Sequence, residues 1–440
     1  MKVSRADSLF GFLNFFSLVK GPDGFGMYRP LSTQVFYFLS NQFFEKSPLP
    51  LHLIAFLFFF GIIYVLYRFV YELTKSKEIS LTSTFLYAFS ATHFGQLYYL
   101  AVFQELAMTL FVLLSCFNFL KNKKLLSFIF FVLALVSKET AVITPLLFGL
   151  IYFYQKYDGN KVVSFKKFLF NLVPFVTTLF IYLLIRVKSY GFATGDSYIW
   201  DFSVKKFLNT TIWYSLWSIN IPESLVDFIG PGININKNIF VYWGNQIIQI
   251  LVLIFLQFIL FAYSIVKSRK SENIKLALFC FAWFVVSLLP VVFLPLHKFS
   301  FYLTLPLIGI VVYLAQKLNR INKILNIVFC SLWLVTSTLT LRFTYETNWI
   351  SQSQIISEKI NNYFKNNYEI LRDKKIIFVD SKDDMTLPWS PTGVVRTVLS
   401  DKNYFLVFYP DIADSVSYSN GVEKSQNDKV FINSRQFLGY

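Results

Sequence analysis

Long apolar segments separated by short polar loops recur through residues 50–341 of the chain. A helix needs about 17–25 mainly apolar residues to cross the hydrocarbon core of a bilayer. The composition, 55% hydrophobic and 15% charged, is far from that of a soluble protein. We therefore predict an all-α polytopic membrane protein with about ten transmembrane helices. The predicted segments are residues 50–73, 79–95, 101–120, 125–137, 140–155, 168–187, 240–266, 276–294, 300–316 and 324–341.

The basic residues indicate how these segments are oriented. The formal net charge is +16, and residues 342–440 hold twelve Lys/Arg and twelve Asp/Glu, so the excess lies in residues 1–341. Loops rich in Lys and Arg alternate with loops poor in them, which is the positive-inside pattern. We therefore interpret the charge as topology rather than as a sign of a nucleic-acid partner, and expect a multi-pass protein of the plasma (inner) membrane in contact with membrane lipid. The basic loops lie near residues 75–77, 121–124, 156–167, 267–275 and 317–323.

Three parts of the chain are predicted to lie outside the bilayer on the external side. In residues 1–49 the apolar run 9–19 is too short to cross, and residues 31–44 are typical of an amphipathic helix lying on the membrane. A second external loop is predicted at residues 188–238, with a helix at 202–219. From residue 342 onward the composition becomes soluble and predicts a small external α+β domain over 342–440. Its expected elements are a helix near 347–371 and strands at 375–380, 394–399 and 404–409.

One charged pair, Lys138-Glu139, interrupts the apolar-rich stretch between Lys124 and Lys156. A single helix through this stretch would hold two charges near the middle of the membrane, at a cost of at least ~2.5–3.5 kcal/mol each. Two short helices that turn at residues 137–140 avoid this cost, so we expect the pair at the external membrane edge. The pair either takes part in function or neutralises itself as the cap of a helical hairpin.

Further polar side chains gather at the predicted external ends of the segments. Arginine, lysine and histidine there would suit a phosphate, and a carboxylate or histidine could perform acid–base chemistry. The alternatives are that the cations reach toward lipid headgroups and that the histidines are structural. No glycine-rich phosphate loop, His/Cys metal spacing or nucleophilic triad is present, so no metal ligand is predicted. The substrate-binding candidates are Arg29, His93, Glu105, Lys138, Glu139, His297 and Lys298.

Three motifs carry a family resemblance over about residues 25–350. They are Tyr28-Arg29-Pro30-Leu31 before the interfacial helix, the segment 134–141 that contains Ser137-Lys138-Glu139, and the Tyr- and Pro-containing turn 297–306. Their order resembles the GT-C class of membrane glycosyltransferases, in the branch of protein O-mannosyltransferases and aminoarabinose transferases. The resemblance implies transfer of a sugar from a polyprenyl-phosphate donor to a glycan, lipid or protein acceptor on the external face, with no certain cofactor.

The resemblance also implies residue roles. Arg29, Lys138 and His297 would bind phosphate or substrate, and Glu139 would orient Lys138. The catalytic base of the family is a carboxylate that follows its first span, and here that span is not found, so we expect an upstream span to be missing from this chain. Asp7 is the predicted catalytic base, unless the base was lost with that span.

Two other functions fit the sequence. A transporter or flippase for a lipid-linked glycan would need polar residues through the bilayer midplane, whereas the charges here gather at one face. A catalytically inactive GT-C-like scaffold would instead use its C-terminal domain to bind partners.

Overall fold

The computed structural model describes residues 6–17, 27–44, 47–157, 163–191, 198–230, 234–268, 273–381, 384, 389–419 and 428–438. The chain divides into two compact units, Met1–Thr344 and Tyr345–Tyr440. The first unit holds the predicted membrane segments.

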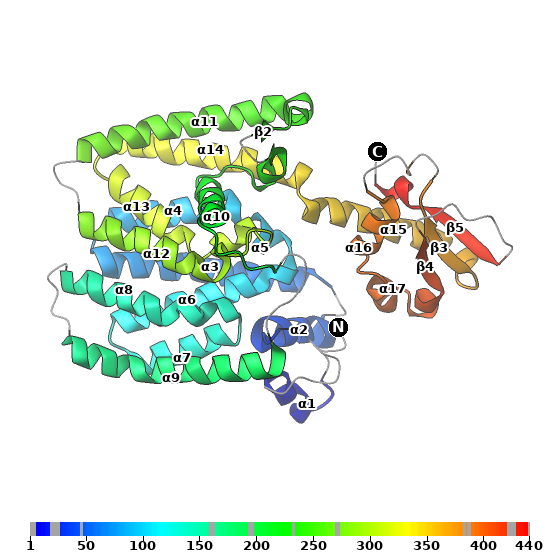
Figure 1. Ribbon diagram of the computed structural model, residues 1–440, viewed down its shortest axis with the longest axis horizontal. Coiled ribbons are helices and arrows are strands. Elements are labelled where there is room, and N and C mark those ends of the chain that lie inside the picture. Colours follow the sequence, from blue (N-terminus) through cyan, green and yellow to red (C-terminus); the bar gives the residue numbers. More distant parts are fainter. Residues whose placement is uncertain are drawn as a thin grey trace. The chain divides into compact units, whose positions relative to one another are not determined.

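The first unit is a bundle of helices whose axes run roughly parallel (Figure 1). Six helices in the described residues are long and apolar enough to cross a membrane, so the chain is an all-α membrane protein in this unit. Each coincides with one predicted segment. They are α3 (Leu49–Thr74), α6 (Phe103–Leu120), α9 (Phe165–Tyr190), α11 (Asn238–Ser268), α12 (Ile274–Val292) and α14 (Lys323–Thr347).

The other four predicted segments correspond to shorter helices. At 12–14 residues, each is about 18–21 Å long, less than the ~30 Å hydrocarbon core. Three of these helices lie next to short 3₁₀ segments in the sequence, such as η6 (Glu139–Ile143) and η9 (Ser300–Leu303). The short helices are α4 (Lys77–Ala88), α7 (Lys124–Leu135), α8 (Thr144–Tyr157) and α13 (Leu307–Leu318).

The basic loops meet at one end of the bundle. Lys121 lies 3.9 Å from the Glu72 carboxylate, which joins the loop after α6 to the end of α3. Lys275 donates to the Tyr157 carbonyl oxygen, and Gln316 donates to the Asn273 carbonyl oxygen at 2.9 Å. These contacts place loops from distant parts of the sequence together, as the positive-inside pattern requires.

Close backbone approach and satisfied polar groups hold the bundle together. At Gly309 of α13 a Cβ atom would collide with the Cys280 carbonyl oxygen of α12, so only glycine allows this approach. The Trp283 and Trp333 indole nitrogens donate to the carbonyl oxygens of Leu305 and Leu86 at 3.1 and 3.0 Å. These two buried tryptophans thus have their N–H groups paired, as a low-dielectric interior favours.

The segments at the opposite end form a layer of short elements. Residues 9–16 and 30–43 form short helices, and residues 229–230 pair with residues 234–235 in an antiparallel ladder. The helix predicted at 202–219 is present as α10, which Figure 1 shows nearly end-on and so crossing the direction of the bundle. These elements are α1 (Leu9–Leu13), η2 (Asn14–Phe16), η3 (Pro30–Val35), α2 (Phe36–Phe43), η4 (Ala91–His93), α5 (Phe94–Tyr98), η5 (Leu100–Val102), α10 (Val204–Trp217), η7 (Glu223–Phe228), β1 (Ile229–Gly230) and β2 (Asn234–Ile235).

The second unit contains helices and a three-stranded parallel sheet in the order β4-β3-β5. The predicted helix near 347–371 is α15 (Trp349–Leu371), and the predicted strand 375–380 is β3 (Lys375–Val379). The apolar inner faces of these elements share one core that includes Ile360, Phe364 and Phe378. That this unit lies outside the membrane stays a prediction.

Two strand predictions in this unit are wrong. Residues 394–399 lie in a helix, because Ser390 caps its start by accepting from the Gly393 N–H at 3.0 Å and Pro391 occupies its first turn. Residues 404–409 lie mainly in a second short helix. The partners of β3 are instead two strands that we did not predict. The remaining elements are α16 (Pro391–Val398), α17 (Asn403–Phe408), η11 (Pro410–Ser415), β4 (Val416–Ser419), β5 (Lys429–Asn433) and η12 (Ser434–Phe437).

Candidate functional site

The helical break predicted in the stretch 124–156 is present, and it places Lys138 and Glu139 outside both helices. Helix α7 ends at Leu135, and Lys138 has extended backbone angles before η6 begins at Glu139. The Ser137 hydroxyl donates to the Leu133 carbonyl oxygen, which closes the last turn of α7. The two charged side chains leave this turn toward different partners.

Lys138 forms a buried ion pair with Glu105 of α6. Its ammonium donates to Glu105 Oε1, and both side chains are only 2% exposed. The Lys138 Nζ also lies 4.5 Å from the centre of the Tyr302 ring, a cation–π arrangement. Burial lowers the pKa of Lys138, and the charge of Glu105 opposes that shift. Charges buried to this degree persist in a fold only when they are paired.

Glu139 pairs with Arg29, which comes from the N-terminal segment. The Arg29 Nε donates to Glu139 Oε2 at 2.8 Å, and its Nη2 donates to Oε1, so the contact is bidentate. Burial alone would raise the pKa of Glu139, but the charge and hydrogen bonds of Arg29 lower it to about 2. The expectation that Glu139 orients Lys138 is wrong, and so is the alternative of a self-neutralised pair, because each member has its own partner.

The backbone of the N-terminal segment is fixed to the same turn. The Leu31 N–H donates to the Val136 carbonyl oxygen at 3.2 Å, and the Ser32 hydroxyl donates to the Ser137 carbonyl oxygen. Arg29 therefore reaches Glu139 from an anchored position rather than from a free loop.

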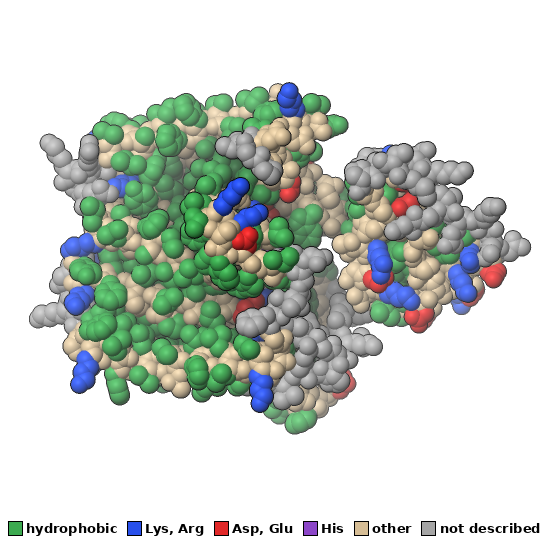
Figure 2. All heavy atoms as spheres, in the orientation of Figure 1, with side chains coloured by type: hydrophobic (Ala, Val, Ile, Leu, Met, Phe, Trp, Pro, Cys, Tyr) green, Lys and Arg blue, Asp and Glu red, His purple; other side chains and the backbone are tan. Residues whose placement is uncertain are grey.

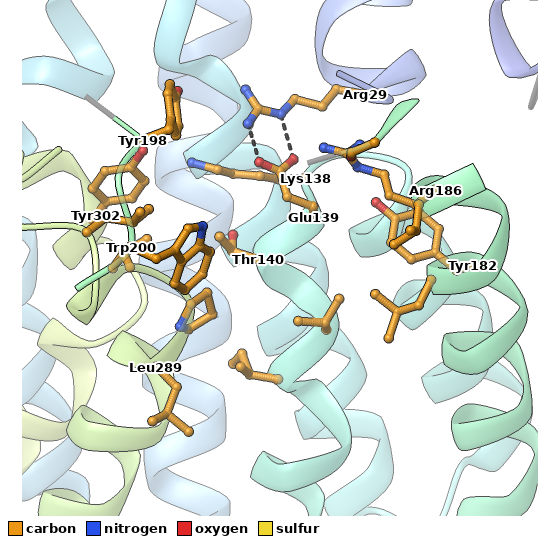
Figure 3. A pocket seen from close by; sticks show the side chains of 18 residues that line it. Arg29, Lys138, Glu139, Thr140, Tyr182, Arg186, Tyr198, Trp200, Leu289 and Tyr302 are labelled. Atoms are coloured by element: carbon orange, nitrogen blue, oxygen red, sulfur yellow. Dashed lines mark hydrogen bonds and ion pairs between the residues drawn. The ribbon is translucent and has the colours of Figure 1, made fainter. Parts of the chain in front are cut away.

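Arg29, Lys138 and Glu139 line a cavity of about 380 Å³ that is polar at one end and apolar at the other, whereas Glu105 is not among its lining residues. Figure 3 shows Arg29, Lys138, Glu139 and Arg186 at one end, with Trp200 and Leu289 farther in. Tyr198 and Tyr302 lie on one side and Tyr182 on the other. The apolar part of the lining is Val142, Ile143, Leu183, Val187, Leu289, Pro290, Val291 and Leu294.

His297 lies behind the aromatic wall of the cavity rather than among its lining residues. Its ring centre is 4.2 Å from that of Tyr198 and 5.8 Å from that of Tyr302, and both tyrosines line the cavity. Burial, with the charges of Lys138 and Arg29, lowers the pKa of His297 to about 4. This pKa favours a neutral imidazole at pH 7. The phosphate-binding role that the resemblance implies for His297 stays a prediction.

Two other predicted residues lie elsewhere. His93 is buried against the rings of Phe59 and Tyr87 and lines a different, mainly apolar cavity. Its Nε2 hydrogen bonds with the Tyr87 carbonyl oxygen at 2.8 Å. Lys298 donates to Asn209 at 3.1 Å and lines a third cavity. The prediction that His93 and Lys298 lie in the same cavity as Lys138 is wrong. Residues that are neighbours in sequence at a turn can point to opposite sides.

Asp7, the predicted catalytic base, is exposed just before α1 and is not among the residues that line the cavity. No described contact joins it to Lys138 or Glu139. Its catalytic role stays a prediction.

The cavity also contains residues that the sequence reading did not select. Arg186 of α9 donates to the Gly191 carbonyl oxygen at 3.0 Å and adds a third cation to the polar end. Trp200 is 46% exposed and contributes an aromatic face, as do Tyr182 and Tyr198. The sequence does indicate Arg186, because it is a charged residue at the end of an apolar segment. The spacing of the aromatic residues gives no indication that they line a cavity.

A comparison with family models, curated proteins and solved structures finds no match to this chain. Among the described residues, no group of three or more His, Cys, Asp or Glu side chains is arranged to hold a metal ion. The function is therefore inferred from the cavity itself. Its described lining can bind an anion through Arg29, Lys138 and Arg186 and an apolar chain through the opposite end.

Proposed function

We propose that this protein is a membrane glycosyltransferase that moves a sugar from a polyprenyl-phosphate donor to an acceptor hydroxyl on the external face. One observation carries the proposal: a single cavity joins three cations to an apolar lining. A polyprenyl-phosphate sugar also has a charged part and an apolar part, since its phosphate lies between a long apolar chain and the sugar. The order of motifs that resembles the GT-C class supports the same assignment.

The reaction that fits this arrangement is a direct displacement. The acceptor oxygen attacks the anomeric carbon, the bond from that carbon to the phosphate oxygen breaks, and its electron pair leaves with the polyprenyl phosphate. Cations fixed near the phosphate stabilise the charge of this leaving group. A carboxylate accepts the acceptor's proton, and Asp7 remains the candidate for it. Glu139 is unsuited because its pKa of about 2 makes it a weak base.

Aromatic side chains in the cavity are suited to the sugar. Tyr198 and Trp200 lie beside the cationic end, where the group attached to the phosphate would sit (Figure 3). Flat aromatic faces pack against the C–H faces of a pyranose, and tyrosine hydroxyls can bond its hydroxyls.

The proposal includes an arrangement in the membrane. Helices α4, α7, α8 and α13 would complete ten crossings together with the six long helices, with their short 3₁₀ extensions reaching the external surface. The end with the basic loops would be cytoplasmic, and the cavity with Arg29 and Glu139 would open to the external side.

The test is sugar transfer by the purified full-length chain in vesicles, with a labelled polyprenyl-phosphate sugar and a mixture of glycan, lipid and peptide acceptors. We expect transfer by the unchanged protein and a loss of at least about tenfold in Arg186→Gln, since a fixed charge on a leaving group contributes about 10²-fold or more in comparable sites. Lys188→Gln is the matched control, because Lys188 is exposed two residues farther along α9 and does not line the cavity.

Two outcomes would overturn the proposal. One is equal transfer by Arg186→Gln and the unchanged protein. The other is movement of the intact lipid-linked sugar between leaflets with no transfer to any acceptor, which would favour a flippase.

A further inference from the structure

A larger cavity, of about 790 Å³, lies between α10, the segment after it and the loop that holds Lys298. It shares no described lining residue with the cavity that contains Lys138. We call it the α10 groove. It does not enter the proposed transfer reaction, so its chemistry needs a separate account.

One end of the α10 groove is basic. Lys205 and Lys206, in the first turn of α10, and Lys298 all line it, and no carboxylate is among its described lining residues. Lys206 and Lys298 are close enough for their charges to act on each other. Two nearby carboxylates lie outside the lining but interact with these lysines: the charge of Asp227 acts on Lys298, and the charge of Lys206 acts on Asp201. An anion in the groove would relieve the repulsion among the lysines.

The rest of the α10 groove is apolar and partly open. Leu208 and Ile212 are 51% and 56% exposed, and they stand four residues apart on one face of α10. Trp213, Val226 and Ile229 complete the wall. Figure 2 shows a small group of basic side chains over α10, with an acidic side chain beside them and hydrophobic surface around the group.

We propose that the α10 groove binds one anionic phospholipid of the surrounding membrane. The phosphate would lie among Lys205, Lys206 and Lys298, and an acyl chain would follow Leu208 and Ile212. Charge complementarity selects this occupant: three lysines face two nearby carboxylates, so an anionic headgroup balances the excess positive charge and a zwitterionic headgroup does not, while a free phosphate would leave the apolar wall uncovered. The helix α10 crosses the direction of the bundle, which is the orientation of a helix that lies in the membrane interface (Figure 1).

The test is native mass spectrometry of the purified full-length chain, released from nanodiscs that contain equal amounts of phosphatidylglycerol and phosphatidylcholine. We expect one retained phosphatidylglycerol in preference to phosphatidylcholine. In Lys205→Gln/Lys206→Gln that preference should fall about thirtyfold, which corresponds to about 1 kcal/mol for each lysine near an anionic lipid. Lys205→Arg/Lys206→Arg keeps the charge and should keep the preference.

The matched control is Lys166→Gln/Lys167→Gln, which removes two exposed lysines at the start of α9 and should leave lipid retention unchanged. The proposal is overturned if both glutamine pairs lower retention equally, or if the unchanged chain shows no preference between the two lipids. It is also overturned if glycerol phosphate displaces phosphatidylglycerol at equal concentration, because the site would then recognise a free phosphate. Transfer activity is not part of this test, so failure here leaves the proposed reaction standing.

Discussion

Arg29 donates two hydrogen bonds to Glu139 across a separation of 110 residues in the sequence. With the neighbouring pair of Lys138 and Glu105, it makes a network of four charges that joins the N-terminal segment, α6 and the turn after α7. The network fixes two of the three cations that line the cavity. Its pairs differ in burial, so they respond differently to substitution and to pH.

Loss of one partner from the deeper pair should be severely destabilising. Lys138→Met leaves Glu105 buried without a partner, and we expect a loss of about 3–5 kcal/mol in stability, seen as a lower unfolding temperature of the detergent-solubilised protein. Lys138→Met combined with Glu105→Gln should recover part of the loss. The control Lys75→Met breaks an exposed pair with Glu72 and should cost less than about 1 kcal/mol. Equal effects of the two lysine substitutions would contradict this reading.

The pair of Arg29 and Glu139 should stabilise the protein in a defined pH range. The pKa of Glu139 falls from an ordinary 4.5 to about 2 in the fold, so its stabilisation is present above pH 4.5 and is lost as the pH falls toward 2. The unfolding temperature of Glu139→Gln should lie below that of the unchanged protein at pH 6.5, and the difference should shrink as the pH falls from 4.5 toward 2. Glu358→Gln, on an exposed face of α15, serves as the control. A difference that stays constant with pH would show that the carboxylate's charge is not the cause.

His297 should remain neutral well below pH 6.5. Burial lowers its pKa to about 4, so the neutral ring stabilises the fold above pH 6.5, and that contribution is lost as the pH falls toward 4. The measurement is NMR of protein carrying ¹³C-labelled histidine, with His297→Gln to assign the signal. We expect the assigned signal to titrate near pH 4. A midpoint near 6.5 would favour His297 as a cation for substrate phosphate.

The contact between α12 and α13 should not tolerate a side chain at position 309. Gly309→Ala drives a Cβ into the Cys280 carbonyl oxygen, a backbone atom that cannot rotate away, and we expect a loss of about 1–3 kcal/mol. Gly149→Ala is the matched control, because nothing lies within 4 Å of its added Cβ and alanine favours the helix. Both are read as shifts in unfolding temperature. An unchanged Gly309→Ala protein would mean that the helices are packed less closely than described.

The sequence predicted those features that rest on local chemistry. Charges inside an apolar run required the break at Lys138, and the long apolar runs required the six long helices. The ion-pair partner of Glu139 was not predictable. The sequence places Glu139 next to Lys138, whereas in the fold Glu139 pairs with Arg29. The helix at residues 391–398 was missed because its Val residues also suit a strand, and only the cap at Ser390 decided between them.

The residues that line the cavity were likewise only partly predictable from the sequence. Arg29, Lys138 and Glu139 were selected as charges near the membrane edge, and the fold brings all three to one cavity. His93 and Lys298 satisfied the same criterion and lie in other cavities, since the criterion gives depth in the membrane but not the direction in which a side chain points. Trp200 and Tyr182 reach the cavity from segments whose aromatic residues look like any others in a chain with 20% aromatic residues.

The most direct test of the account is an electron cryomicroscopy structure of the full-length protein with bound polyprenyl phosphate. We predict the phosphate within hydrogen-bond distance of Arg186 or Lys138, with the prenyl chain along Leu289 and Val291. A phosphate located in another cavity, or a cavity that stays empty at saturating lipid, would contradict the central claim that this cavity holds the carrier of the sugar.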